Sequence, residues 1–99
     1  MIYCFDIDGT LCTKGHEDYK NAKPFLDRIK IVNDLYDEGN KIILFTARGA
    51  ATGIDWKELT KKQVEAWGLK HNELIFGKPH ADVFIDDKAN DIFKWFSED

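Results

Sequence analysis

The sequence predicts an α/β fold: a small parallel sheet of about four strands with helices on both faces, in a Rossmann-like three-layer α/β/α arrangement. Three observations lead to this prediction. The 99 residues suffice for one domain but not for two, so residues 1–99 are expected to form a single domain. Apolar runs of strand length alternate with segments of helical period. These runs are apolar throughout, which is typical of parallel strands buried on both faces.

The first strand is expected over residues 1–7, where an apolar run leads into Asp6, Asp8 and a Gly-Thr pair. A buried strand gains nothing in packing from two carboxylates, because unpaired buried charge is costly. Such a pair suits a cation, and a carboxylate at a strand end can attack an electrophile. The alternative is a strand that simply runs into a polar Asp-Gly turn.

A polar stretch over residues 12–23 predicts an exposed loop or a small hairpin. Pro24 then suits the first turn of a helix. Apolar residues follow at helical spacing, and Gly39 with Asn40 predicts the end of that helix. The predicted buried stripe consists of Phe25, Ile29, Val32 and Tyr36, with Leu26 and Leu35 beside it.

The second strand is expected over residues 41–46, and a loop of small residues follows. Asp55 and Glu58 resemble a capping box at the start of a second amphipathic helix, which stops at Gly68. Its apolar stripe is Trp56, Leu59, Val64 and Trp67.

Two short strands are predicted in the last third of the chain, over residues 73–76 and 82–86. A final short helix is expected from the spacing of Ala89, Ile92, Phe93 and Phe96.

Composition excludes several classes of protein. The formal net charge is −4 and the lysines are scattered, so no basic patch for long nucleic acid is expected. No apolar run approaches the roughly 20 residues of a membrane helix, and no charged leader precedes the first strand. We therefore expect a cytoplasmic protein in which Cys4 and Cys12 are free thiols.

Polar residues gather where the predicted strands end. In an open parallel sheet the functional crevice lies at the carboxyl ends of the strands, where the strand order reverses. If the order is 4-1-2-3, Asp6 and Asp86 become neighbours. Four carboxylates at one edge would repel one another without a cation, and their hard oxygens suit Mg²⁺. Lys78 and the Thr46 hydroxyl offer what a phosphoryl group needs. The four acids are Asp6, Asp8, Asp86 and Asp87.

These features together resemble the four motifs of the haloacid dehalogenase-like (HAD) superfamily. The matching features are DIDGT at residues 6–10, an apolar strand ending in Thr46, Lys78 after a third strand, and Asp86-Asp87 ending a fourth. They occur in the expected order and span nearly the whole chain. FTARG at residues 45–49 and KPHADVFIDDKA at residues 78–89 further resemble small hydrolases of capsule and lipopolysaccharide biosynthesis.

The resemblance implies a Mg²⁺-dependent phosphatase. Asp6 would be the nucleophile that forms an aspartyl-phosphate. Asp8 would act as general acid and then as general base. Lys78 would neutralise charge on the nucleophile and the phosphoryl group.

The resemblance also implies the binding residues. Asp86 would bind the metal with the Asp6 carboxylate and the Asp8 main-chain carbonyl, and Asp87 would help to hold it or would orient Lys78. The substrate-binding residues would be Thr46, Ala47, Arg48 and Lys78, with Thr46 on a phosphoryl oxygen and Arg48 on a second acidic group of the substrate.

Neither insertion point for a cap domain is long enough to fold into one, so the chain resembles a capless member with residues 11–23 as a short flap. An open site either admits a bulky substrate or is closed by another subunit, and because such chemistry needs water excluded we expect a homo-oligomer. The expected substrate is a small phosphorylated metabolite, such as a sugar phosphate, with hydrolysis and phosphotransfer both open. The alternatives are a phosphatase of nucleotide or nucleic-acid ends and a non-catalytic regulatory subunit.

Overall fold

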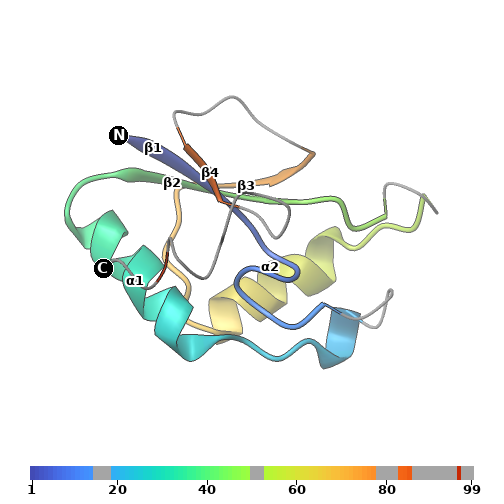
Figure 1. Cartoon of the computed structure of the whole chain (residues 1–99). Coiled ribbons are helices and arrows are strands. Elements are labelled where there is room, and N and C mark those ends of the chain that lie inside the picture. Colours follow the sequence, from blue (N-terminus) through green and yellow to red (C-terminus); the bar gives the residue numbers. More distant parts are fainter. Residues whose placement is uncertain (15–18, 50–52, 78–82, 86–95, 97–99) are drawn as a thin grey trace.

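A computed structural model describes residues 1–14, 19–49, 53–77, 83–85 and 96 of the chain. The strands are β1 (Ile2–Asp6), β2 (Lys41–Thr46), β3 (Glu73–Phe76) and β4 (Val83–Ile85). The helices are α1 (Leu26–Asp37) and α2 (Lys57–Ala66), with a short 3-10 turn, η1 (Tyr19–Asn21). The predicted α/β fold with a parallel sheet is confirmed (Figure 1).

The sheet has the order β3-β2-β1-β4, and every neighbouring pair is parallel. Asp6 pairs with Phe45 of β2, and Phe5 pairs with both Leu44 of β2 and Ile85 of β4. β1 is therefore an inner strand. Its carboxyl end lies between the ends of β2 and β4, which is where ligands bind in sheets of this kind.

Alternate residues of β1, β2 and β3 enter two separate clusters, which explains why these strands are apolar throughout. Phe5 of β1 and Leu44 of β2 belong to the larger core, which α1 and α2 cover with Ile29, Val32 and Val64. The intervening residues form a smaller cluster on the other face, consisting of Cys4, Ile43 and Phe45 with Ile2 and Ile75 beside it. Both faces of the sheet thus exclude water from apolar side chains.

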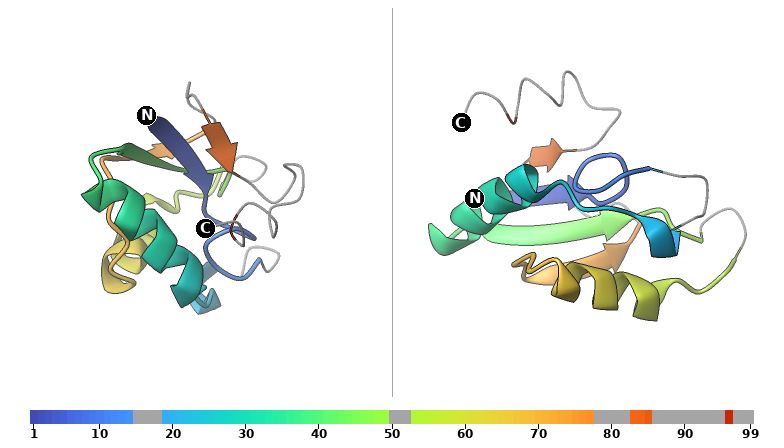
Figure 2. Two further views of the ribbon diagram at one scale, coloured as in Figure 1. Left: turned by 60° about the vertical axis from the view of Figure 1, so that its left-hand side comes forward. Right: turned by 90° about the horizontal axis from the view of Figure 1, so that it is seen from below.

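The expected second helical layer is not seen in the part of the chain that the structure describes. Both α1 and α2 lie on the same side of the sheet (Figures 1 and 2). The predicted last helix falls on residues 89–96, of which only Phe96 is described. Phe96 packs against Phe5, with ring centroids 6.3 Å apart, and so belongs to the same core as α1.

Both predicted helix ends use the glycine that the sequence places there. Gly39 and Gly68 have φ of +95° and +68°, which side chains other than glycine rarely adopt. After α1 the Gly39 amide donates to Tyr36 and the Asn40 amide donates to Leu35, and α2 ends with the same pair of bonds. This is the Schellman pattern, which satisfies the last carbonyls of each helix.

The helix starts differ from the prediction. α1 begins at Leu26, and Pro24 instead forms an antiparallel bridge with Cys12 that closes the base of the flap. α2 begins at Lys57 with Trp56 as its N-cap, and Asp55 accepts a hydrogen bond from the Lys57 amide. Asp55 is therefore one residue too early to cap the helix, and the expected capping box is not formed.

Two residues of the predicted α1 stripe lie outside the core. Leu26 is 67% exposed and Tyr36 is 36% exposed, because the face buried by the sheet is narrower than the spacing suggested. In the described residues there is no helix with the length and apolar character needed to cross a membrane.

Candidate active site

The chain makes a tight turn directly after β1, and this turn positions the two acids of the first motif. Asp6 is the last residue of β1. The amides of Thr10, Leu11 and Cys12 all lie within hydrogen-bonding distance of the Ile7 carbonyl, at 3.3, 2.9 and 3.2 Å. Gly9 has φ of +83°, which lets the chain turn back on itself here. Asp8 is thereby held at the carboxyl edge of the sheet.

Arg48 donates hydrogen bonds to the Asp8 carboxylate from two of its guanidinium nitrogens. Nε donates to Oδ1 and Oδ2 of Asp8 at 3.2 and 2.9 Å, and Nη2 donates to Oδ1 at 2.8 Å. The Arg48 side chain is fully buried, and the Asp8 side chain is 15% exposed. A buried fork of this kind is strong and directional, so Asp8 has one fixed orientation.

Thr46 joins this pair from the end of β2. Its hydroxyl donates to Asp8 Oδ2 at 3.2 Å and accepts a hydrogen bond from the Arg48 amide at 3.1 Å. Parallel pairing of β1 with β2 brings these residues together, as strand ends on one sheet edge must meet. The structure therefore places Asp8, Thr46 and Arg48 in one hydrogen-bonded cluster.

The rest of the Arg48 guanidinium is held by α2 and the flap. Nη1 donates to the Thr60 hydroxyl at 3.1 Å and to Gln63 Oε1 at 2.6 Å. The Tyr19 ring lies against the guanidinium, with Cζ 4.6 Å from the ring centroid. Sequence reasoning missed these three residues. The available signal was the pair of polar residues, Thr60 and Gln63, three apart on the inner side of an amphipathic helix.

Cys12 also lies against the Asp8 carboxylate. Its Sγ is 3.6 Å from Asp8 Oδ1 and 3.5 Å from the Ile7 carbonyl oxygen. Burial, together with the negative charge of Asp8, raises the pKa of the Cys12 thiol to about 12, although Arg48 acts in the opposite direction. Cys12 is therefore a protonated donor at neutral pH. Cys4 and Cys12 are both free and buried.

Arg28 supports the same turn from α1. Its Nη1 donates to the Thr10 carbonyl at 2.9 Å, and its guanidinium lies 5.0 Å from the ring centroids of both Phe25 and Phe96. This second buried arginine was also missed, because it stands in the polar part of the helical pattern. Its long side chain reaches past the apolar stripe to the turn.

Two residues that were expected to contact the substrate form hydrogen bonds within the protein. Arg48 was expected to meet an acidic group of the substrate, but its guanidinium is used inside the protein. The Thr46 hydroxyl, expected on a phosphoryl oxygen, is fully buried and already both donates and accepts. A direct substrate contact by either side chain would require these bonds to break. Ala47, between them, is exposed.

Lys78, Asp86 and Asp87 lie outside the described residues. Among the residues that are described, no three His, Cys, Asp or Glu side chains form a metal-binding group. Asp6 and the Asp8 main-chain carbonyl are the two described candidates for oxygen ligands, and no described group donates a hydrogen bond to that carbonyl. Hard oxygens at a strand end fit Mg²⁺.

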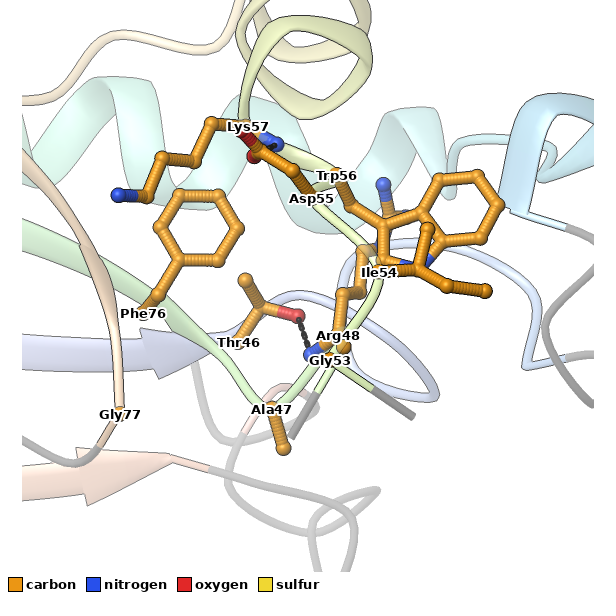
Figure 3. A pocket seen from close by; sticks show the side chains of 11 residues that line it. Thr46, Ala47, Arg48, Gly53, Ile54, Asp55, Trp56, Lys57, Phe76 and Gly77 are labelled. Atoms are coloured by element: carbon orange, nitrogen blue, oxygen red, sulfur yellow. Dashed lines mark hydrogen bonds between the residues drawn. The ribbon is translucent and has the colours of Figure 1, made fainter. Parts of the chain in front are cut away.

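A pocket of about 400 Å³ opens beside this cluster, at the ends of β2 and β3 (Figure 3). Thr46 and Arg48 belong to its lining, so the pocket is continuous with the group around Asp8. Its other side chains come from the stretch that leads into α2 and from Phe76, the last residue of β3. The size is within the range of small-molecule sites.

Comparison with known proteins supports the fold. No family model matches the chain, and no curated protein matches its sequence. A crystal structure of a protein from Vibrio cholerae is similar with a TM-score of 0.77 and 27% identity, over 98% of this chain and 89% of that one. A chain in the structure of a Pnkp1/Rnl/Hen1 complex is similar with a TM-score of 0.63 and 19% identity, over 99% of this chain and 34% of that one.

Proposed function

We propose that the protein is a Mg²⁺-dependent phosphatase that hydrolyses a phosphate monoester through an aspartyl-phosphate on Asp6. The single observation that supports this best is the fixed Asp8 carboxylate, held by Arg48 and Thr46 two residues beyond the nucleophile. A turn that only closes a strand has no need of a buried arginine fork. The four motifs of the sequence resemble the HAD superfamily, and the parallel sheet agrees with that resemblance.

The proposed reaction has two steps. An oxygen of Asp6 attacks phosphorus, the bond to the leaving oxygen breaks, and Asp8 gives that oxygen a proton. Water then attacks the aspartyl-phosphate while Asp8 takes a proton, and the bond to Asp6 breaks to release inorganic phosphate.

The contacts of Asp8 suit the second step directly. Arg48 and Thr46 both donate to the carboxylate, which is therefore placed as a proton acceptor. To act as the acid of the first step, Asp8 must first take up a proton.

The metal would lie at the carboxyl end of β1. Asp6 and the Asp8 main-chain carbonyl would hold it, together with Asp86 and Asp87, which follow β4 in the sequence. A bound Mg²⁺ would neutralise charge on the phosphoryl oxygens. Lys78 would add a positive charge on the same group.

The substrate is proposed to be a sugar phosphate or a similar metabolite of surface-polysaccharide biosynthesis, on the resemblance of residues 45–49 and 78–89 to such hydrolases. Nucleotide or nucleic-acid ends form the second candidate, favoured by the aromatic lining of the neighbouring pocket. A cytoplasmic location and a homo-oligomer that closes the site remain proposals from the sequence. A non-catalytic regulatory subunit is the alternative outside enzyme function.

The test is hydrolysis of 4-nitrophenyl phosphate with Mg²⁺ by the wild type, by Asp6→Asn and by Asp34→Asn as a matched control. Asp34 is an exposed acid on α1, paired only with Lys30 at 3.1 Å in the described structure. We expect Asp6→Asn to lose at least about a thousandfold in kcat, because the nucleophile is removed. Full activity of Asp6→Asn would refute the assignment of Asp6 as the nucleophile. A folded wild type that turns over no monoester would favour the regulatory alternative.

A further inference from the structure

The pocket beside Thr46 is lined largely by apolar and aromatic side chains, which favours one kind of ligand. We call it the β2–β3 pocket and define it by Thr46, Ala47, Ile54, Trp56, Lys57 and Phe76 among its lining residues. Figure 3 shows the Phe76 ring beside Thr46, with the Lys57 side chain on the same side of the pocket. Ile54 is 50% exposed, although it is a large aliphatic residue. A ligand bound in the pocket would remove this apolar surface from water.

Trp56 provides a fixed wall. Its ring meets the Tyr19 ring edge-on, with centroids 5.0 Å apart, and its carbonyl accepts a hydrogen bond from the Thr60 hydroxyl at 2.7 Å. Gly49 allows the loop to close at this point, because a Cβ there would lie 2.2 Å from the Ile54 carbonyl oxygen. The apolar walls are thus held in place by the flap and by α2.

Four main-chain amides around the pocket already have partners within the protein. The Arg48 amide donates to the Thr46 hydroxyl, and the Gly77 amide donates to the Thr46 carbonyl. The Lys57 amide donates to the Asp55 carboxylate, and the Gly53 amide donates to the Gly49 carbonyl. The Arg48 guanidinium is buried against Asp8. The Lys57 ammonium has no carboxylate partner among the described residues. A hexose ring carries a hydroxyl on nearly every carbon, and the hydroxyls that faced Ile54 and Phe76 would be left unpaired.

The pocket is close enough to Asp6 to receive part of the same substrate. Thr46 and Asp6 lie on adjacent strands, and Phe76 lies one strand further. Strands are about 4.8 Å apart, so the pocket begins roughly 5–10 Å from the end of β1. That is comparable to the separation between the phosphate and the base of a nucleotide.

We infer that the β2–β3 pocket binds a flat, largely apolar ring in the leaving group of the substrate, either an aryl ring or a nucleobase. Phe76 and Trp56 contact the faces or edges of the ring, and Lys57 meets a polar or anionic substituent on its rim. This inference rests on the proposed function, since it describes the leaving group of the same phosphate ester. It favours a monoester with an aromatic leaving group over the hexose phosphate that the proposed function places first.

The test compares phenyl phosphate and adenosine 5′-monophosphate with glycerol 1-phosphate and glucose 6-phosphate, each with Mg²⁺. We expect the wild type to favour the two aromatic esters, phenyl phosphate and adenosine 5′-monophosphate, by at least about tenfold in kcat/KM. Phe76→Ala should lose that preference through KM, and Phe76→Leu should lose part of it. Leu26→Ala, an exposed apolar residue on α1, is the matched control and should change nothing. Comparing kcat/KM for phenyl phosphate with that for adenosine 5′-monophosphate distinguishes a pocket for an aryl ring from a pocket for a nucleobase.

Binding gives a readout that does not depend on turnover. Adenosine should quench tryptophan fluorescence of the wild type without Mg²⁺, and the quench should be lost in Phe76→Ala and in Trp56→Phe. An equal or greater preference for glucose 6-phosphate, or ring preference unchanged in Phe76→Ala, would overturn the inference. If no ester is hydrolysed but adenosine still binds through Phe76, the phosphatase proposal fails and the pocket assignment stands. If neither occurs, both fail.

Discussion

Arg48 holds both oxygens of the Asp8 carboxylate, although the two residues are 40 positions apart in the chain. They meet because β1 and β2 are parallel neighbours whose carboxyl ends share one edge of the sheet. The pair is almost fully removed from solvent. Interactions between charges weaken much less with salt in such a place than at the surface, so the pair can define the orientation of Asp8.

Arg48→Ala should destabilise the protein by about 3–5 kcal/mol, because it leaves the Asp8 carboxylate buried without its partner. It also removes the donor to Thr60 and Gln63. Urea unfolding measures the loss. The stability of Arg48→Lys should lie between that of the wild type and that of Arg48→Ala, since an ammonium keeps the charge but cannot form the two-nitrogen contact. Lys30→Ala removes an exposed pair and should cost at most about 0.5 kcal/mol. Equal effects of Arg48→Ala and Lys30→Ala would contradict the buried role of Arg48.

Gly49→Ala should destabilise the protein more than Gly53→Ala, although both glycines have positive φ, +84° and +75°. The shared cost of that backbone conformation is roughly 1–2 kcal/mol. Only at Gly49 would the new Cβ also meet backbone, 2.2 Å from the Ile54 carbonyl oxygen, while at Gly53 no atom of the described residues lies within 4 Å. Thermal unfolding of the two variants isolates the steric part. If both lose the same stability, the close approach that shapes the β2–β3 pocket is not required.

The stability of the protein should fall as pH rises above the ordinary range of a thiol. The pKa of Cys12 is raised to about 12 in the folded protein, so between about pH 9 and 12 the unfolded chain loses this proton while the folded chain keeps it. The folding equilibrium constant then falls by up to about tenfold for each pH unit in this range. Cys12→Ser does not titrate and should show a shallower alkaline decline in urea unfolding. Cys4 is present in both proteins and cancels. Parallel curves would contradict the assignment.

The strands and the helix ends could be predicted from the sequence because each depends on local features. Apolar runs identify the strands, and Gly39 and Gly68 end the helices through backbone freedom alone. The meeting of Asp8 with Thr46 was also within reach, because parallel strands bring their ends together.

The role of Arg48 could not be predicted in the same way. Its sequence position, just after a strand, is equally compatible with contact to substrate and with an inward fork. The choice depends on where Thr60 and Gln63 lie, and these come from a helix whose register the sequence did not fix. The capping box failed for a related reason: packing of Trp56 against Tyr19 accompanies a helix start one residue later than Asp55 could cap.

Gln63 should couple the flap to the acid, because its two amide atoms face different parts of the site. Oε1 accepts from Arg48 Nη1 at 2.6 Å, and Nε2 donates to the Tyr19 carbonyl. Gln63→Leu removes both bonds and leaves a buried guanidinium N–H with one partner fewer, which costs about 1–3 kcal/mol. Gln63→Glu keeps an acceptor for Arg48 but cannot donate to Tyr19, so it should loosen the flap alone.

Hydrogen exchange of the amides at residues 19–22, measured together with urea unfolding, separates these two effects. Gln63→Glu should speed exchange in the flap with little change in global stability, because the Arg48 contact is retained and its acceptor becomes charged. Gln63→Leu should both speed exchange and lower stability. Lys62→Gln, a neighbouring exposed position on α2, should do neither. If flap exchange in Gln63→Glu matched the wild type, the bond to Tyr19 would not restrain the flap, and α2 would act on the site through Arg48 alone.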